Sequence, residues 1–441
     1  MGEAMNLLIV CYHDPDSNLI GATRVRKFAE NISASGCSVK VLSRAGVRSY
    51  EDGVGSCEVL VPGHQVSAGQ GTRAKTAPRP SAGPRPARDY VRATHWWSKV
   101  RPKLTWVFRH LIAVPDRELF SVRTLLTHSR DLGAWSPELI VVSGPPFSSF
   151  VVAARIARQR GIPWVADYRD LWTVGQHYLL GPVRRRLDRR IESCLLRTAS
   201  LVTTVSQPLA DQMYQAFGLR SEVVLNGYDP NDLSALAVVS DVGVGLPLRI
   251  VYTGEIFEEK KDSEPLFTAL ASMEVGPDQV LVECHGNTVH LVEDAARRHG
   301  VERLVTCGPR LPHTESVAIQ QGADVLLLLM WNDPGDEGVY TGKIFEYLGA
   351  RRPILMLGFA GGVAADLIRG RNAGVIANDP EDIAAVLRTW LTAKRQTGLL
   401  PILPETVCEG LTRQEQSERL RQLCESLIHD TRQGMGSCAR A

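Results

Sequence analysis

The sequence predicts an α/β protein of two Rossmann-like, doubly wound domains that face a common cleft. Short aliphatic runs alternate with longer segments of helical periodicity over residues 1–230, and the alternation resumes over residues 247–411. This pattern is typical of parallel sheets. A polar and then Gly- and Val-rich stretch at 231–246 separates the two series, and 441 residues are long for a single core. We therefore expect an N-terminal domain, a linker and a C-terminal domain.

The N-terminal domain opens with a predicted strand at 6–12 (NLLIVCY), a loop, a helix that ends near Ser35, and a strand at 39–42. The loop lacks the GxGxxG fingerprint of dinucleotide-binding proteins, so a Rossmann dehydrogenase is disfavoured. We expect its glycine and neighbouring residues, Gly21 and Thr23, to meet a sugar or a phosphate instead.

An irregular segment, predicted to be a mobile insert at about 65–115, interrupts this domain. Its middle is rich in Pro, Gly and Arg, which cannot build a core. Between Arg73 and Arg109, ten basic residues stand against one acid, Asp89, and several aromatic residues lie among them. Residues 90–110 suit peripheral contact with an anionic membrane. Packing on the domain and single-stranded nucleic acid remain as alternatives, and we favour no nucleic acid partner.

Alternation resumes after the insert, with polar residues where the strands end. Strands are expected at 137–142, 163–166, 201–205 and 222–225, with helices at 150–160, 182–198 and 208–217. Asp167 and Asp170 follow the second of these strands, where carboxylates are placed to bind an acceptor or act as a general base. A structural Asp–Arg pair is the alternative. Gly144 and Asn226, on neighbouring loops, are expected to line the same cleft.

The C-terminal domain is expected to contain six strands, at 248–253, 280–284, 304–307, 324–330, 354–357 and 374–376. Helices fill the intervals between them. A last amphipathic helix from Thr412 to about Ile428, followed by a tail to residue 441, is expected to cross back to the N-terminal domain.

The strongest candidate site lies at residues 337–353, EGVYTGKIFEYLGARRP, between two hydrophobic strands. A helix that begins near Thr341 would point its free N–H groups and positive dipole end into the crevice, which favours phosphate. Gly342 lets a ligand approach that backbone, and Lys343 adds a positive charge. Glu346, one turn further, can accept two hydrogen bonds from a ribose diol. An ordinary surface helix with solvated charges remains the alternative.

Two further loops are expected at the cleft. The loop after the strand at 248–253 contains Gly254, Lys260 and Lys261, and either lysine could neutralise a diphosphate leaving group. A solvated charge run is the alternative there. Arg310 and Leu311 follow the strand at 304–307.

Bulk properties exclude several function classes. The net charge of +2 argues against a general nucleic-acid binder, and nine scattered cysteines form no CxxC pair or metal-spaced cluster. The start of the chain lacks signal-peptide features, and no run reaches the roughly 18–20 apolar residues of a membrane span. We therefore expect a cytoplasmic protein, placed at the inner face of the membrane if the insert contacts lipid. Neither a Walker A motif nor a GxSxG elbow occurs, so a P-loop kinase and a serine hydrolase are disfavoured.

Five motifs in this order, SGPPFSS, IPWVADYRDLW, VVLNGYD, YTGEIF and TGKIFEYLGARRPIL, resemble the GT-B-fold glycosyltransferases of the retaining family 4 type. The similarity runs from about Asn6 to Ile428 outside the insert. It implies transfer of a sugar, with retention, from a nucleotide-diphosphate sugar to a cell-surface glycan, a lipid-linked glycan or a small molecule. No metal or other cofactor is implied, and UDP, GDP and dTDP donors remain open.

The resemblance also implies residue roles, with some departures from the family pattern. Glu346 matches the second glutamate of the paired-glutamate motif, whereas the first falls at Gly338. We expect backbone N–H groups of Tyr340 to Gly342 to substitute for it. The usual arginine after the Gly254 loop is absent, which leaves Lys260, Lys261 or Lys343 for the diphosphate. Arg310 and Leu311 lie on the loop that faces the nucleobase, and Asp167 and Asp170 fall in the acceptor-side region.

Two alternative functions remain open from the sequence. A GT-B-fold epimerase or hydrolase would release or isomerise the sugar without an acceptor, and a non-catalytic homologue would bind the nucleotide alone.

Overall fold

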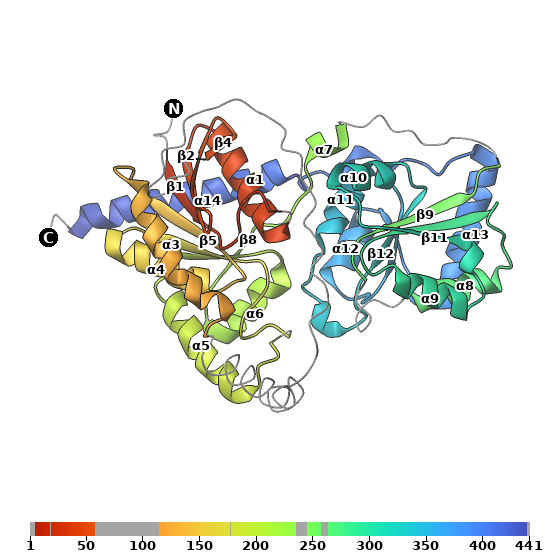
Figure 1. Cartoon of the computed structure of the whole chain (residues 1–441), viewed down its shortest axis with the longest axis horizontal. Helices are drawn as coiled ribbons and strands as arrows, with labels where there is room; N and C mark the ends of the chain where they lie inside the picture. The colour runs from red at the N-terminus through yellow and green to blue at the C-terminus, as the bar shows by residue number, and fades with distance from the viewer. Residues whose placement is uncertain are drawn as a thin grey trace, which may run out of the picture.

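The computed structural model describes residues 5–17, 19–57, 114–176, 178–234, 245–256 and 263–438. The chain forms two α/β lobes side by side, each with one sheet between helices (Figure 1). The predicted fold class is therefore confirmed.

The N-terminal sheet has eight strands in the order β4-β3-β2-β1-β5-β6-β7-β8. The strands are β1 (Asn6–Val10), β2 (Ser38–Ser43), β3 (Gly46–Glu51), β4 (Val54–Cys57), β5 (Leu139–Gly144), β6 (Trp164–Tyr168), β7 (Leu201–Thr204) and β8 (Glu222–Val223). All pairs are parallel except β2–β3 and β3–β4. The register between β1 and β5 runs from Leu7↔Leu139 to Val10↔Val142.

The hairpin made by β3 and β4 was not among the strands predicted for this domain. The turn between these two strands, Asp52-Gly53, has a positive φ at both residues, +47° and +81°. Tyr50 fills the core with only 2% of its surface exposed. Alternating burial along β3 therefore supports a strand that its polar composition had concealed.

Helices cover both faces of this sheet. They are α1 (Ile20–Ala34), α3 (Val122–His128), α4 (Ser148–Arg160), α5 (Pro182–Leu196) and α6 (Gln207–Phe217). Successive residues of β1 point to opposite faces: Leu8 and Val10 join one core cluster, and Leu7 and Ile9 join the other. A strand buried on both faces needs a continuous apolar run, which NLLIV provides.

The C-terminal sheet has six strands in the order β11-β10-β9-β12-β13-β14, and every pair is parallel. Its strands are β9 (Leu248–Thr253), β10 (Val280–His285), β11 (Val305–Gly308), β12 (Val325–Leu329), β13 (Ile354–Leu357) and β14 (Gly374–Ile376). Its helices are α8 (Glu264–Ser272), α9 (His290–Arg298), α10 (His313–Gln321), α11 (Gly342–Ala350), α12 (Val363–Gly370) and α13 (Pro380–Thr397). Each strand therefore ends at the same edge, where α11 begins.

The chain passes between the lobes twice, and the two passages pair with each other. The first runs through Tyr228 into α7 (Pro230–Ser234), and the second precedes α14 (Arg413–Cys438). Tyr228 N–H donates to the Leu411 carbonyl (3.2 Å), and Arg413 N–H donates to the Tyr228 carbonyl (2.8 Å). These bonds join the passages into one hinge.

The last helix, α14, returns to the N-terminal lobe and packs against α1 (Figure 1). Leu420, Cys424 and Ile428 belong to the core cluster that contains β1 and α1. Within the described ranges, no helix is long and apolar enough to cross a membrane.

Candidate functional site

The helix α11 lies on the side of the C-terminal lobe that faces the N-terminal lobe (Figure 1). Thr341 is the N-cap residue in extended conformation, and its side chain makes no capping hydrogen bond. Its Oγ1 is buried without a partner, and Gly342 faces open space. The first N–H groups of a helix have no intrahelical acceptor. This end of α11 is therefore an uncapped positive dipole end.

Lys343 extends from the same turn of α11 across Gly254, at the end of β9. A side chain at Gly254 would overlap the lysine ammonium, and the backbone φ of +139° is one that glycine adopts readily. The ammonium lies 5.1 Å from the centroid of the Tyr252 ring. Burial lowers the pKa of Lys343, although the Glu346 and Glu255 carboxylates oppose that shift. Two predicted binding residues thus meet at one place.

Glu346 lies on α11 next to the hinge, with 23% of its side chain exposed. Gln320 Nε2 is 3.5 Å from its Oε2, a long and weak contact. His313 Nδ1 lies 4.0 Å from its Oε1, and His313 Nε2 lies 3.0 Å from Asp232 Oδ2. The hydrogen bond to Asp232 and then the charge of Glu346 raise the pKa of His313 against burial. The histidine therefore links Glu346 to α7.

Arg413, the first residue of α14, is half-buried at the hinge near the same carboxylate. Burial lowers the pKa of its guanidinium, and the Glu346, Asp229 and Asp232 charges oppose that shift. Sequence reasoning assigned neither Arg413 nor His313 to the site. The capping box formed by Thr412 and Glu415 marks the start of α14, but the approach to Glu346 depends on tertiary structure.

The loop before α11 contacts the N-terminal lobe directly. Ser206 Oγ donates to the Gly338 carbonyl (2.7 Å), and Gln176 Nε2 donates to Asp336 Oδ1 (2.5 Å). A Cβ atom at Gly338 would lie 2.9 Å from Leu209 Cδ2 of α6. Gly338 therefore permits the two lobes to meet. Tyr340, two residues on, is half-buried and packs 5.4 Å from the Phe345 ring.

Asp167, at the end of β6, is a structural residue, and this corrects the prediction that it serves as a general base. The carboxylate is fully buried and forms a bidentate pair with Arg24 Nη2 (2.9 Å) and Nε (3.0 Å). Ser143 Oγ and Thr203 Oγ1 also donate to it, each at 2.8 Å. Burial alone would raise the pKa of Asp167, but Arg24 and the hydroxyls hold it below its usual value. No oxygen remains for a substrate proton.

Two other predicted binding residues at this edge, Asn226 and Gly144, also make contacts within the fold. Asn226 Oδ1 accepts from Arg24 Nη1 (3.0 Å), so its carbonyl oxygen is committed. Gly144 is buried, and a Cβ there would lie 2.8 Å from the Phe150 ring. The prediction that Gly144 admits a ligand is therefore corrected, because the missing side chain makes room for an aromatic residue.

Arg169 lies between Asp167 and Asp170 in the sequence, at the strand end where those two carboxylates were predicted to act. Its Nη2 donates to the Pro145 carbonyl, and its buried Nε has no partner. A side chain at Gly21 would overlap the guanidinium, so this glycine admits an arginine to the start of α1. Burial, and then the charges of Arg169 and Arg44, lower the pKa of His13. Arg169 and Arg44 therefore place positive charge beside His13.

The remaining predicted residues have varied placements. Thr23 is half-buried in the first turn of α1, Asp170 and Arg310 are exposed, and Leu311 is half-buried in the loop after β11. Lys260 and Lys261 lie outside the described residues, as do Trp96, Trp97 and the rest of residues 90–110. In the part of the chain that is described, no three His, Cys, Asp or Glu side chains gather as a metal site.

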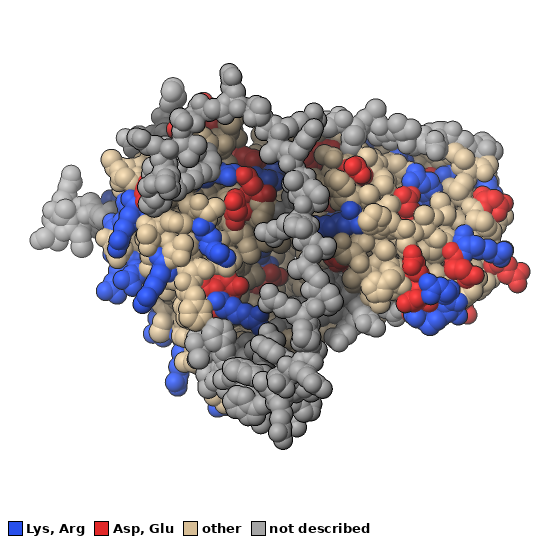
Figure 2. Space-filling view, in the orientation of Figure 1, with Lys and Arg blue, Asp and Glu red and all other residues tan. Residues whose placement is uncertain are grey.

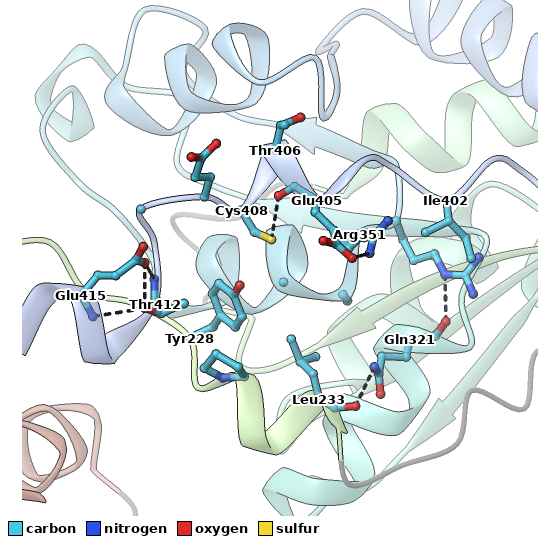
Figure 3. Close-up of a pocket in the computed structure, with 16 residues that line it drawn as sticks. Tyr228, Leu233, Gln321, Arg351, Ile402, Glu405, Thr406, Cys408, Thr412 and Glu415 are labelled. Atoms are coloured by element: carbon cyan, nitrogen blue, oxygen red, sulfur yellow. Dashed lines mark hydrogen bonds and ion pairs between the residues drawn. The ribbon is translucent and has the colours of Figure 1, made fainter. Parts of the chain in front are cut away.

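A pocket of ≈ 840 Å³ lies at the hinge (Figure 3), where both passages and the C-terminal end of α11 meet. Figure 3 shows Tyr228, Leu233 and Cys408 around it, with Arg351 paired to Glu405 at 3.0 Å. The uncapped N-terminus of α11 is not part of its lining. The pocket therefore belongs to the hinge and not to the start of α11.

Comparisons with known proteins agree with the resemblance seen in the motifs. Residues 21–228 match the model of a glycosyl transferase 4-like domain. No curated protein matches the chain. Sucrose-phosphate synthase from Thermosynechococcus elongatus is similar at 13% identity and a TM-score of 0.57, over 99% of each chain.

Two further solved structures are similar over nearly their whole length. Anabaena HepE in complex with UDP and glucose has 14% identity and a TM-score of 0.58, over 96% of this chain and 100% of that one. The lipopolysaccharide glycosyltransferase WaaG has 16% identity and a TM-score of 0.51, over 95% and 99%. At these identities the likeness concerns the fold, and the chain has the two-domain GT-B architecture of these glycosyltransferases.

Proposed function

We propose that this protein is a retaining glycosyltransferase that moves a sugar from a nucleotide-diphosphate sugar to an acceptor. The single observation that supports this most is the uncapped N-terminus of α11, with Lys343 beside it, directed at the opposite lobe. Helix N-termini of this kind bind phosphate. The C-terminal lobe would hold the donor, and the edge of the N-terminal lobe around His13 and Arg169 would hold the acceptor.

The chemistry of the transfer suits these groups. Cleavage of the anomeric C–O bond places negative charge on the diphosphate and positive charge on the sugar. The N–H groups at Gly342 and the Lys343 ammonium would stabilise the departing diphosphate. A lysine that is half-buried in the free protein regains a counter-charge when the donor binds, which favours binding of the diphosphate over a neutral nucleoside.

Retention fits the same geometry. Asp167, a strand-end carboxylate, is committed to Arg24, so it cannot serve as a covalent nucleophile. The acceptor hydroxyl would attack from the face that the diphosphate leaves. Its oxygen forms the new anomeric bond, the donor C–O bond breaks, and a diphosphate oxygen takes the hydroxyl proton. The Lys343 ammonium and the N–H groups at the start of α11 would supply the charge stabilisation without a metal.

Glu346 is proposed to bind the donor ribose, supported by its position one turn into α11. Backbone N–H groups of Tyr340 to Gly342 would take the place of the family glutamate that Gly338 replaces. Uridine donors are the first to test because the HepE structures contain UDP and UDP-glucose. We further propose a cytoplasmic enzyme whose acceptor is a cell-surface or lipid-linked glycan or a small molecule.

The donor site is tested by titrating nucleoside and nucleoside diphosphate separately. Lys343→Met should weaken UDP binding by about 1.5–3 kcal/mol, the range for hydrogen bonds to charged groups, and leave uridine binding unchanged. Glu346→Gln should weaken both ligands, because both carry the ribose. Glu302→Gln, an exposed carboxylate far along the chain from α11, is the matched control. Equal losses for UDP and uridine in Lys343→Met would contradict the diphosphate assignment.

Turnover separates the competing functions. Incubation with UDP-, GDP- and dTDP-sugars, with chelator and with or without candidate acceptors, should release nucleotide only when an acceptor is present. Release or epimerisation without acceptor would favour an epimerase or hydrolase. No release from any donor, together with intact nucleotide binding, would favour a non-catalytic homologue. Activity that the chelator abolishes would contradict metal independence.

A further inference from the structure

The pocket at the hinge has walls from both passages between the lobes. Tyr228 and Leu233 belong to the first passage, and Ile402 and Cys408 belong to the segment before α14 (Figure 3). The end of α11 completes the lining. A volume of ≈ 840 Å³ falls within the roughly 300–1,000 Å³ of small-molecule sites. The pocket is therefore large enough for a small molecule and lies apart from the proposed donor site.

Arg352, just after α11, brings a buried positive charge to this pocket. It is only 4% exposed and lines the pocket. Its Nε donates to the Gln321 carbonyl (2.8 Å), but no carboxylate of the described residues forms an ion pair with its guanidinium. Burial lowers the pKa of Arg352, and the charge of Asp324, which is itself paired with Lys394, opposes that shift. An anion bound in the pocket would supply the missing counter-charge.

The other charged groups of the lining limit what this anion can be. Arg351 is already engaged, because its Nη1 pairs with Glu405 (3.0 Å) and its Nε donates to the Leu403 carbonyl (2.7 Å) (Figure 3). Glu415 accepts from Thr412 in the capping box of α14. Glu409 also lines the pocket and is exposed. A ligand with a second anionic group would therefore meet charge of its own sign.

Gln321, the last residue of α10, adds a polar group that lacks a partner. Its Nε2 donates to the Leu233 carbonyl (3.0 Å), which fixes the orientation of the amide (Figure 3). Its Oε1 is buried and accepts no hydrogen bond. A buried acceptor without a donor is costly. A hydroxyl or N–H group of a ligand would satisfy it.

We propose that the hinge pocket binds a small amphipathic anion. One carboxylate or phosphate group of the ligand would pair with Arg352, and a hydroxyl or N–H group would donate to Gln321 Oε1. The apolar body of the ligand would lie against Tyr228 and Leu233, with Ile402 at its edge. A mainly apolar site with a few polar groups that fix orientation is the usual form of a small-molecule pocket.

The position of the pocket gives such a ligand an effect on the hinge. Its walls come from both passages, so movement of one lobe relative to the other changes its shape. In this structure the lobes touch, since Ser206 Oγ donates to the Gly338 carbonyl (2.7 Å). A ligand that fits the pocket in this form therefore favours the closed arrangement. The proposal does not rest on the enzymatic activity proposed above, and failure of the donor site would leave it standing.

Binding is tested with two fluorescent probes that differ in charge. Anilinonaphthalene sulfonate has an anionic group, an N–H donor and apolar rings, and phenylnaphthylamine has the same rings and donor without the charge. Arg352→Gln should weaken binding of the sulfonate about 10- to 150-fold, the range for a hydrogen bond to a charged group, and leave the neutral probe unchanged. Ile402→Trp should fill the mouth of the pocket and abolish binding of both probes.

Matched controls separate the pocket from general effects of charge and folding. Arg388→Gln removes an exposed arginine from α13, and Leu179→Trp adds an indole at a side chain that is 87% exposed in the N-terminal lobe. Both should bind the probes as the wild type does. Ile402 is 54% exposed, so Ile402→Trp tests the site even where Arg352→Gln fails to fold. Displacement of the sulfonate by phenylacetate or by phenyl phosphate shows which anionic group the pocket prefers.

Hydrogen exchange measures the effect on the hinge. Saturating anilinonaphthalene sulfonate should slow exchange of amides 333–339, next to the contact between the lobes, in the wild type but not in Ile402→Trp. Four results would overturn the proposal: no binding of the sulfonate by the wild type, binding retained by Ile402→Trp, equal losses of both probes in a folded Arg352→Gln, or exchange that the bound probe leaves unchanged.

Discussion

Replacing Gly338 with glutamate is expected to push the two lobes apart, even though it restores the residue that glycosyltransferases of the resembling family have at this position. A Cβ atom at Gly338 would lie 2.9 Å from Leu209 Cδ2, 3.1 Å from Leu209 Cγ and 3.3 Å from Ser206 Oγ. All three atoms belong to the N-terminal lobe. A glutamate would continue into the same space and place its carboxylate against a leucine that is only 9% exposed.

The size of the effect follows from two contributions. Overpacking against Leu209 costs about 1–3 kcal/mol, and loss of the hydrogen bond from Ser206 Oγ to the Gly338 carbonyl costs about 1 kcal/mol. Together they weaken contact between the lobes by about 2–4 kcal/mol, which lowers the equilibrium constant for closure roughly 30- to 700-fold. Gly338→Ala should weaken the contact between the lobes by the lower end of this range, because it adds only one methyl group.

Small-angle scattering and hydrogen exchange measure this opening. Gly338→Glu should increase the radius of gyration and speed exchange of amides at the start of α6, with little change in thermal unfolding of either lobe. Adding Leu209→Ala, which removes both close carbon atoms, should restore much of the closed form to Gly338→Ala. Scattering and exchange that stay unchanged in Gly338→Glu, or a second substitution without effect on Gly338→Ala, would refute this reasoning.

Two other changes test the ion pairs on either side of the hinge. Asp167→Asn should lower the free energy of unfolding by about 3–5 kcal/mol, because Arg24 is left buried without its charge partner. Urea titration measures this loss of stability. A loss below about 1 kcal/mol, the range of an exposed ion pair, would contradict a structural role for Asp167. Because the pKa of Asp167 is lowered in the fold, its stabilisation is present above the unfolded pKa and lost as pH falls through the folded value. His313→Gln should flatten the pH profile of thermal unfolding: the raised pKa of His313 means that its pairing with Asp232 stabilises the fold at mildly acidic pH and is lost as pH rises through that pKa. Parallel profiles for wild type and His313→Gln would show that this pair does not contribute.

The fold was predictable because burial on both sides of a sheet leaves a strong local signal. The aliphatic runs of β1, β12 and β13 mark strands that are covered on each face. The hairpin of β3 and β4 was missed because GVRSYE carries polar residues on its half-exposed side, although its two-residue turn, Asp52-Gly53, is the Asp-Gly pair typical of such hairpins and has φ of +47° and +81°. Periodicity reports burial, so a strand with mixed exposure is hard to recognise.

The site was predictable only where one segment contains its groups. Thr341, Gly342 and Lys343 are neighbours in the chain, and the strand-to-helix rule places them at the sheet edge. The same rule placed Asp167 at that edge but could not show that Arg24, 143 residues away in sequence, neutralises it. The approach of Lys343 to Gly254 is also a tertiary contact. The position of a residue at a strand end can be predicted from the sequence, whereas the tertiary contacts that decide whether its side chain is free to react cannot.

The return of α14 to the N-terminal lobe has a consequence for biosynthesis. Leu420, Cys424 and Ile428 complete a core that is otherwise built from β1, α1, β2 and β3 together with residues of β5 and β6. A nascent polypeptide on the ribosome therefore cannot finish its first lobe until the last segment has emerged from the exit tunnel. The second lobe, whose strands and helices are contiguous in sequence, can close earlier. Premature termination just before α14 would thus damage the lobe that is translated first.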